Sequence, residues 1–390
     1  MSNLTAAAIN SLAMPPVAQS IQTDPNPYAT LMAQASARAR THGARTPPVL
    51  SPDDNSVLNA QVPVAALQRT GVRVIPWTTN DPDRMRAVIR LGVDGLISDR
   101  PDLLQKVLAE ERAAATPELR RSLQQFDVAG HRGGRGLRPE NTLPAFEVGL
   151  DHGINTIETD IGITSDHVSL IWHDQFLNPQ SCRRADGAPY TLENRVYIRD
   201  ISIKEAQKTY LCDQLHFGPD QKNDLALSPV AVAFAKHEDL ISPWVPTYVK
   251  QLFSFTRFYA NYYRTGPGKS HPRAAQRALT ADRVHFNLET KILPPPSPGR
   301  PDPTLPSERV ENHTVTPQIF VDTLCGAIIR AGMQARSNIQ SFDFRTLILV
   351  EEQHPDIPTF YLTEDAHIHS SEFVPIPLRQ PPHNVALSKL

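Results

Sequence analysis

Short apolar or β-branched segments alternate with helical segments along most of this chain, and that alternation limits what it can fold into. Eight segments have the pattern of strands, two before residue 100 and six after residue 125. Helical segments separate most of them, an order typical of βα units and a parallel sheet. We therefore predict an α/β fold, a (β/α)8 TIM barrel, with functional residues at the carboxyl ends of its strands.

The ends of the chain differ in composition from its centre. Residues 1–55 are rich in Ala, Ser, Pro, Thr and Asn without sustained periodicity, so we predict a disordered or weakly ordered segment with a short helix near 28–40. Residues 56–365 carry the strand and helix patterns and are predicted to form a single domain. The tail 366–390, which contains Pro and His, is expected to be irregular.

Charge and hydropathy exclude several classes of protein. Hydrophobic residues make up 40% of the 390, as in a globular protein with a core, and the formal net charge is −2. The sequence contains no long basic run, so we expect no nucleic-acid partner. No apolar stretch reaches the roughly 18–20 residues of a membrane span, and the N-terminus lacks the features of a signal peptide. We expect a cytoplasmic protein, and the composition leaves its oligomeric state open.

The three cysteines, Cys182, Cys212 and Cys325, are an odd number without CxxC spacing. They match neither a zinc motif nor a disulfide framework. We interpret them as free thiols, with a Cys182–Cys212 bridge as the less favoured alternative.

Acidic and histidine residues stand at the ends of several predicted strands. Glu158 and Asp160 are two apart on one strand, so their side chains project to the same face. With Glu289 from another strand they form an oxygen-only cluster, which suits Ca²⁺ or Mg²⁺ rather than zinc. The alternative is a set of salt-bridged acids at the rim of a barrel.

Two strand-end histidines, His131 and His173, are candidate proton carriers because their ordinary pKa lies near 6.5. Arg132 and Lys291 are candidates for binding phosphate oxygens, or else salt-bridge partners of the nearby acids. Together these side chains indicate metal-assisted cleavage of a phosphate ester.

Three further residues have two interpretations each. Glu140 and Asn141 follow a proline and precede a helix, so capping is an alternative to a site role, and we expect Asn141 to be only a cap. Trp77, at a strand end, is expected either to line the substrate pocket or to pack in the core.

The segments HRGGRGLRPENTLPAFEVGLDHG (131–153), ETDIGITSDHVSLIWHD (158–174) and NLETK (287–291) resemble the glycerophosphodiester phosphodiesterase family. The resemblance implies a TIM barrel, a divalent cation (Ca²⁺ or Mg²⁺) and hydrolysis of small-molecule glycerophosphodiesters to sn-glycerol 3-phosphate and an alcohol. It implies an enzyme, a phosphoric diester hydrolase, whose residues would act as follows: His131 and His173 in acid–base catalysis, Glu158, Asp160 and Glu289 as metal ligands, and Arg132 and Lys291 at the phosphate.

The order of the segments differs from that of the family. A segment that resembles the late part of the family, VIPWTTNDPDRMRAVIRLGVDGLISDRPDLL (74–104), precedes HRGG. We expect a circular permutant in which 56–110 supply the final two βα units and 125–365 the first six, because a closed barrel brings its first and last strands together. The alternative is a tandem or rearranged reading frame whose barrel closes by exchange between chains.

Two other functions stay open at this point. A lysophospholipase D-like or other phosphodiesterase would use the aromatic stretch 252–263 as an apolar lid, although core packing is the favoured role for that stretch. A non-catalytic binding module would be an incomplete or rearranged barrel.

Overall fold

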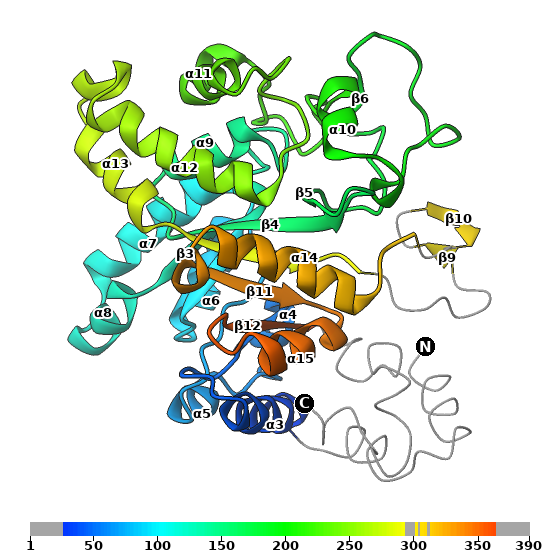
Figure 1. Ribbon diagram of the computed structural model, residues 1–390. Coiled ribbons are helices and arrows are strands. Elements are labelled where there is room, and N and C mark those ends of the chain that lie inside the picture. Colours follow the sequence, from blue (N-terminus) through cyan, green and yellow to red (C-terminus); the bar gives the residue numbers. More distant parts are fainter. Residues whose placement is uncertain (1–25, 293–300, 303–304, 310–312, 364–390) are drawn as a thin grey trace, which may run out of the picture. The chain divides into compact units, whose positions relative to one another are not determined.

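The computed structural model of the protein describes residues 26–292, 301–302, 305–309 and 313–363 (Figure 1). The described chain divides into two compact units. Unit 1 contains residues 26–96, 107–126 and 338–363, and unit 2 contains residues 97–106 and the described part of 127–337. The predicted irregular tail 366–390 and the first 25 residues of the predicted disordered segment lie outside the described residues.

In unit 1 a strand from the N-terminal region pairs with a strand from the C-terminal region. β1 (Val49–Pro52) runs parallel to β12 (Thr359–Thr363), which also pairs in parallel with β11 (Ser337–Ser341). On its other side β1 forms isolated parallel bridges, Leu50 with Val74 and Asp53 with Trp77. The Asp94 N–H donates to the Val74 carbonyl just before β2 (Gly95–Ser98). The chain's two ends thus contribute adjacent strands to one sheet.

The helices of this part of the chain follow or precede these strands. They are α3 (Pro27–Thr41), α4 (Asp54–Leu58), α5 (Val64–Arg69), α6 (Pro82–Arg90), α7 (Pro101–Ala114), α8 (Pro117–Gln124) and α15 (Phe344–Gln353), with α7 continuing across the boundary with unit 2.

The short helix predicted near 28–40 is confirmed as α3, whereas the disorder predicted for the rest of the described residues 26–55 is wrong. Asn26 caps α3 by accepting a hydrogen bond from the Ala29 N–H, and the helix buries Tyr28, Leu31 and Met32. All four residues of β1 are buried as well. Spacing of the apolar side chains by three and four residues is the helical signal in this segment.

Unit 2 is built around three parallel strands. β4 (Thr156–Ile163) pairs in parallel with β3 (Asp127–Gly130) on one side and with β8 (His285–Thr290) on the other. β5 (Ser169–Ile171) pairs with β4 in the antiparallel direction. The expected strand at 170–174 is therefore the second arm of a hairpin and not a parallel member. The five residues 164–168 between β4 and β5 are too few for a parallel crossover, which needs about a dozen.

Helices and short elements complete unit 2. The α-helices are α9 (Leu143–Asp151), α10 (Ile203–Thr209), α11 (Pro229–His237), α12 (Val249–Arg264), α13 (Ala274–Arg283) and α14 (Pro317–Arg330). The remaining strands are β6 (Arg183–Arg184), β7 (Tyr210–Leu211), β9 (Pro301–Asp302) and β10 (Leu305–Arg309), and the 3-10 turns are η1 (His131–Gly133), η2 (Ile198–Asp200), η3 (Leu225–Leu227), η4 (Pro267–Ser270) and η5 (Gln334–Arg336). Within the described chain, every helix is too short or too polar to cross a membrane.

The aromatic stretch 252–263 belongs to the core of unit 2. It forms most of α12, which buries Leu252, Phe253, Phe255 and Tyr259. The Phe253 ring lies edge-on to Phe286 of β8, with centroids 4.8 Å apart. The core-packing role favoured from the sequence is the one observed.

The predicted α/β class of the TIM-barrel type is confirmed, because the strands are mostly parallel and alternate with helices. The distribution of strands differs from the prediction. In the described chain three strand segments precede residue 100 (β1, the segment through Val74 and Trp77, and β2), and the parallel strands after residue 125 are β3, β4, β8, β11 and β12. β1 was missed because it is only four residues long, follows two prolines and ends in a third.

The segment 172–248 between β5 and α12, called the excursion below, contains a disulfide bond between Cys182 and Cys212. The interpretation of these two residues as free thiols is wrong. β6 and β7 pair in antiparallel register with Arg183 opposite Leu211, which places the two adjoining cysteines opposite each other. Their spacing of 30 residues gave no sign of this local hairpin pairing. Cys325 is free and buried, and burial raises the pKa of its thiol to about 12.

Candidate active site and metal centre

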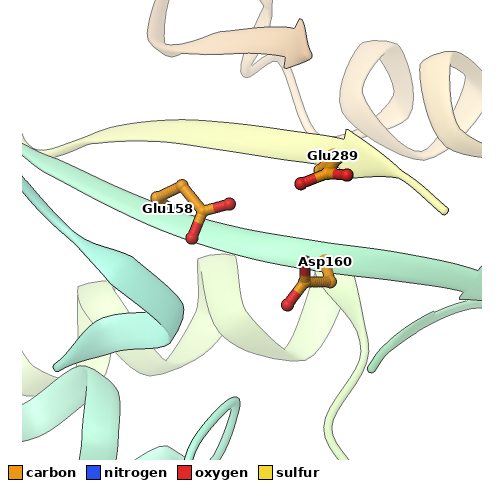
Figure 2. A group of neighbouring side chains, drawn as sticks. All are labelled: Glu158, Asp160 and Glu289. Carbon is orange, nitrogen blue, oxygen red and sulfur yellow. The ribbon is translucent and has the colours of Figure 1, made fainter. Parts of the chain in front are cut away.

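Three carboxylates from two neighbouring strands form a buried cluster (Figure 2). Glu158 and Asp160 project from the same face of β4, and Glu289 lies opposite Asp160 in the parallel register of β8. One oxygen from each side chain lies within 4.8 Å of those of the other two. All three predicted metal ligands are thus brought together.

The pKa values of Glu158 and Asp160 are shifted in opposite directions. Burial, together with the charges of Asp160 and Glu289, raises the pKa of Glu158 well above its ordinary value. Burial also favours the neutral form of Asp160, but Arg132 and Lys291 outweigh it and hold the pKa of that carboxyl well below its ordinary value. Three acids this close repel one another unless a proton or a cation lies among them.

Two basic side chains from the predicted set lie against the cluster. Arg132 Nε is 3.0 Å from Asp160 Oδ2, and its guanidinium also pairs with Glu140. Lys291 Nζ is 3.2 Å from Asp160 Oδ1 and 2.5 Å from Glu289 Oε1. Both are therefore salt-bridge partners of the acids in this structure, and the carboxylates outweigh the effect of burial to raise the pKa of Lys291.

Arg132 also reaches the cluster through its backbone. Its φ of 51° lies in the left-handed region, which non-glycine residues seldom adopt. In this conformation the Arg132 N–H donates to Glu158 Oε2 at 3.0 Å. The following Gly133 has φ 86°, and a Cβ there would lie 2.6 Å from the Ala145 main chain, so only glycine fits. The glycines of the HRGG segment allow this turn directly after β3.

His131 follows β3 and lies beside Glu158. Its Nε2 is 3.9 Å from Glu158 Oε2, and its Nδ1 is 2.5 Å from Asp99 Oδ1. Burial and the nearby Arg135 lower the pKa of His131 to about 4. Burial opposes ionisation of Asp99, but His131 and Arg135 together hold its pKa below the ordinary value. At neutral pH the pair is a neutral imidazole and an ionised carboxylate.

His173 lies two residues after β5, the hairpin strand that pairs with β4. The Trp172 N–H donates to the Asp160 carbonyl, which fixes the end of β5 beside β4. His173 Nδ1 is 2.7 Å from Asp174 Oδ1, and Asn178 donates to the other oxygen of Asp174. Burial raises the pKa of Asp174, but the contact with His173 outweighs it, and the net effect lowers that pKa. Both histidines thus have Nδ1 on an aspartate.

Asn141 is not a helix cap, contrary to the prediction. Thr142 caps α9 by accepting from the Ala145 N–H. Asn141 instead donates through Nδ2 to Asp160 Oδ2 at 2.8 Å and accepts from the Thr159 hydroxyl at 2.6 Å. It is buried and orients a carboxylate of the cluster.

Glu140 supports Arg132 from the other side and is held by the disulfide-closed excursion. The Ser181 hydroxyl donates to Glu140 Oε1 at 3.2 Å and lies 2.7 Å from His216 Nε2. Asp99, Asp174, Ser181 and His216 were not assigned to the site from the sequence. Of these four, only Asp174 could have been suspected from the sequence, because it directly follows His173.

Trp77 belongs to unit 1. Its indole N–H donates to the Ser51 carbonyl at 2.9 Å, and its ring lies edge-on to Phe342 with centroids 5.3 Å apart. These contacts match the packing role, and a role in lining a substrate pocket stays a prediction.

The carboxylate cluster has the chemistry of a site for a hard divalent cation. It offers oxygen atoms only, from three acids, as Ca²⁺ and Mg²⁺ sites do. Among the described side chains, Asp160 Oδ1 is a buried oxygen that accepts no hydrogen bond, although Lys291 lies near it. A cation held by these three carboxylates would relieve the repulsion that contributes to the raised pKa of Glu158.

Comparison with known proteins gives one extensive match and several short ones. The sequence matches the family described as "Glycerophosphoryl diester phosphodiesterase family" over residues 4–103 and 131–257, together more than half of the chain. A glycerophosphodiester phosphodiesterase of Bacillus altitudinis is 38% identical over 66 residues, which are 17% of this chain and 27% of that protein. A glycerophosphodiester phosphodiesterase domain-containing protein 4 of Macaca fascicularis is 44% identical over 45 residues, 12% of this chain and 7% of that protein.

Among solved structures, a phosphodiesterase of Oleispira antarctica in complex with the product sn-glycerol-3-phosphate is 14% identical. The similarity covers 60% of this chain and 65% of that one, with a TM-score of 0.34. The curated matches named above are shorter still, and the chain spans less than a third of the length of either protein.

Proposed function

The chain belongs to the glycerophosphoryl diester phosphodiesterase family, and on that premise we propose that it hydrolyses glycerophosphodiesters to sn-glycerol 3-phosphate and an alcohol. The observation that supports this most directly is the buried cluster of Glu158, Asp160 and Glu289 beside a histidine whose other ring nitrogen contacts an aspartate. Metal ligands and proton carriers are the two requirements of such a hydrolysis.

Glu158, Asp160 and Glu289 would hold the divalent cation, either Ca²⁺ or Mg²⁺. When bound, the cation would neutralise phosphate charge and polarise an oxygen of the substrate. Asn141 and the Arg132 N–H orient two of the three carboxylates, so the ligand set is held in place before a cation arrives.

His131 and His173 would exchange protons with the attacking and the leaving oxygen. Each has its Nδ1 on an aspartate, which leaves Nε2 to face a substrate. One histidine removes a proton from the nucleophile and the other protonates the departing alcohol. Each transfer contributes typically 10²–10⁴-fold to the rate.

Arg132 and Lys291 would bind the phosphate oxygens. Both already lie against acids of the cluster, so their charges are fixed at the place where a phosphate would meet the cation. Glu140 would act through Arg132, whose guanidinium it holds. Trp77 is proposed to line the substrate pocket.

The two alternative functions have less support. A lysophospholipase D-like enzyme with a lid at 252–263 would need that stretch to be accessible, whereas α12 buries most of its aromatic side chains. A non-catalytic module would not need to retain both histidines and all three carboxylates.

The disulfide bond bears on where the protein works. Disulfides persist in oxidising compartments and are rare in the cytosol. The Cys182–Cys212 bond therefore counts against the cytoplasmic location expected from the sequence, and we propose an oxidising compartment. Fractionation of cells that express the protein, with thiol labelling in each fraction, tests this.

The test of the activity is release of glycerol 3-phosphate from glycerophosphocholine by the purified full-length chain with Ca²⁺, with Mg²⁺ and with a chelator. We expect release that depends on the metal and that chelation abolishes. Metal-independent release would remove the cluster from the mechanism. No release from folded protein loaded with either metal would contradict the proposed substrate class.

A further inference from the structure

His131 is held by a carboxylate that lies outside the proposed metal cluster. Asp99 follows β2 directly, and its Oδ1 lies 2.5 Å from His131 Nδ1. Across the imidazole, Nε2 lies 3.9 Å from Glu158 Oε2. One ring nitrogen therefore faces Asp99 and the other faces the cluster.

Asp99 is itself fixed through both its side chain and its backbone. Arg135 Nε donates to the same oxygen, Oδ1, at 2.6 Å, and the Arg135 guanidinium stacks 4.3 Å from the centre of the Phe217 ring. The Gly136 N–H donates to the Asp99 carbonyl at 3.1 Å. A Cβ at Gly136 would lie 2.9 Å from that carbonyl oxygen, so only glycine allows the approach. Asp99 therefore has little freedom to leave His131.

A fixed carboxylate decides which nitrogen of a neutral imidazole carries the proton. An ionised carboxylate can only accept, so a hydrogen bond between it and Nδ1 requires the proton on Nδ1. We propose that Asp99 is a positioning residue that fixes His131 as the Nδ1–H tautomer and orients Nε2 for proton transfer. This role rests on the proposed hydrolysis, because it concerns a proton exchanged with the substrate.

A purely structural role for Asp99 would be to hold Arg135 and the loop from Gly134 to Glu140. Such a role makes no demand on the tautomer of His131. The ¹⁵N NMR signals of the His131 ring, assigned by their loss in H131Q, separate the two roles. In the wild type at pH 7.5 without metal we expect the proton on Nδ1 and a lone pair on Nε2.

Asp99→Ala should release the ring to the Nε2–H form or to a mixture of both forms. Asp99→Leu keeps a side chain of similar bulk without an acceptor oxygen, so it carries the test if D99A does not fold, and it should release the ring in the same way. The proposal is overturned if wild-type His131 carries its proton on Nε2. It is also overturned if the proton stays on Nδ1 alone in a folded Asp99 variant.

Kinetics on glycerophosphocholine with Ca²⁺ or Mg²⁺ give the second readout. We expect D99A or D99L to lower kcat by about 10–100-fold, less than the roughly 10²–10⁴-fold of a general acid or base, because Asp99 acts only through His131, with KM changed by less than about threefold. The control is Asp102→Asn, three residues after Asp99. It removes a carboxylate that pairs with Arg100. D102N should keep both constants, and an Asp99 variant that matched it would overturn the proposal.

The two readouts also separate this proposal from the proposed function. If the wild type does not hydrolyse glycerophosphocholine with either metal, the proposed function fails. The position of the His131 ring proton then still tests the positioning role of Asp99. If hydrolysis is observed and the tautomer does not depend on Asp99, the function stands and the positioning role fails.

Discussion

Lys291 places its ammonium nitrogen 2.5 Å from Glu289 Oε1, so a side-chain cation already neutralises one of the three clustered acids. The same nitrogen lies 3.2 Å from Asp160 Oδ1. Lys291 and a divalent cation would therefore neutralise the same oxygens, and the two residues Lys291 and Glu289 should affect metal binding in opposite directions.

Lys291→Met should tighten metal binding while lowering activity. Removing the ammonium leaves the acids less neutralised, so a divalent cation gains attraction, by about tenfold or more in affinity at the dielectric near a protein surface. The metal-free variant should lose stability of the order of 3 kcal/mol, because breaking a buried ion pair leaves an uncompensated charge. Calorimetric titration with Ca²⁺ and urea denaturation without metal check both effects. Weaker Ca²⁺ binding by K291M would contradict the shared role.

Glu289→Gln should have the opposite effect on the metal. It removes one charged ligand of three, and Ca²⁺ sites depend steeply on ligand charge, so we expect affinity to fall by at least about tenfold. The metal-free fold should be retained, since one source of repulsion is removed. Calorimetric titration measures the affinity, and Glu238→Gln, at an exposed position after α11, serves as the control. Wild-type affinity and turnover in E289Q would exclude Glu289 from the site.

His173→Ala should lower kcat on glycerophosphocholine by roughly 10²–10⁴-fold. This expectation follows from the proposed role of His173 as a proton carrier; Asp174 contacts its ring, and 31% of its side chain is exposed. Steady-state kinetics of H173A beside His237→Ala, a histidine exposed at the end of α11, give the comparison. A loss below about threefold would show that His173 carries no proton in the reaction.

Stability should depend on pH through His131. Burial and Arg135 lower the pKa of the folded-state histidine from 6.5 to about 4, so the unfolded chain binds the proton more tightly. The stabilising effect of the neutral ring is then complete above pH 6.5 and is lost as the pH falls towards 4. Between pH 7.5 and pH 5 the free energy of unfolding of the metal-free wild type, relative to H131Q, should fall by about 2 kcal/mol. Urea denaturation at both pH values measures this difference, and a constant difference would contradict the lowered pKa.

The site residues that could be predicted from the sequence are those that lie on strands or directly at strand ends. Glu158 and Asp160 share a face because they are two apart on a strand, and Glu289 joins them because β4 and β8 pair with Asp160 opposite Glu289. These positions follow from strand periodicity and parallel pairing. Asp99 could not be found in this way, since it precedes a helix-starting proline and meets His131 only in the folded chain.

The fold shows the same division. The parallel strands β3, β4 and β8 were predicted from their apolar patterns, whereas β1 is four residues long and owes its place to pairing with β12, more than 300 residues further along the chain. Asn141 has a sequence position typical of a cap, but Thr142 is the cap of α9. The side-chain amide of Asn141 instead donates to Asp160. Cys182 and Cys212 meet because β6 and β7 pair, a short contact without a sequence signature.

The disulfide links the stability of the excursion to the support of Arg132. Cys182 follows Ser181, whose hydroxyl donates to Glu140, and Glu140 holds the Arg132 guanidinium. The bond closes a loop with a sequence separation of 30 residues, for which chain entropy predicts about 3–4 kcal/mol of stabilisation. Cys182→Ser with Cys212→Ser should lower the free energy of unfolding by about that amount and raise KM for glycerophosphocholine, since a looser Ser181 holds Glu140 less firmly.

Urea denaturation and steady-state kinetics, each with and without a reducing agent, test both effects of the disulfide. The reducing agent should weaken the wild type and leave the double variant unchanged. Equal effects on both proteins would place the sensitivity elsewhere, and loss of stability without a rise in KM would break the proposed link from the disulfide to Arg132.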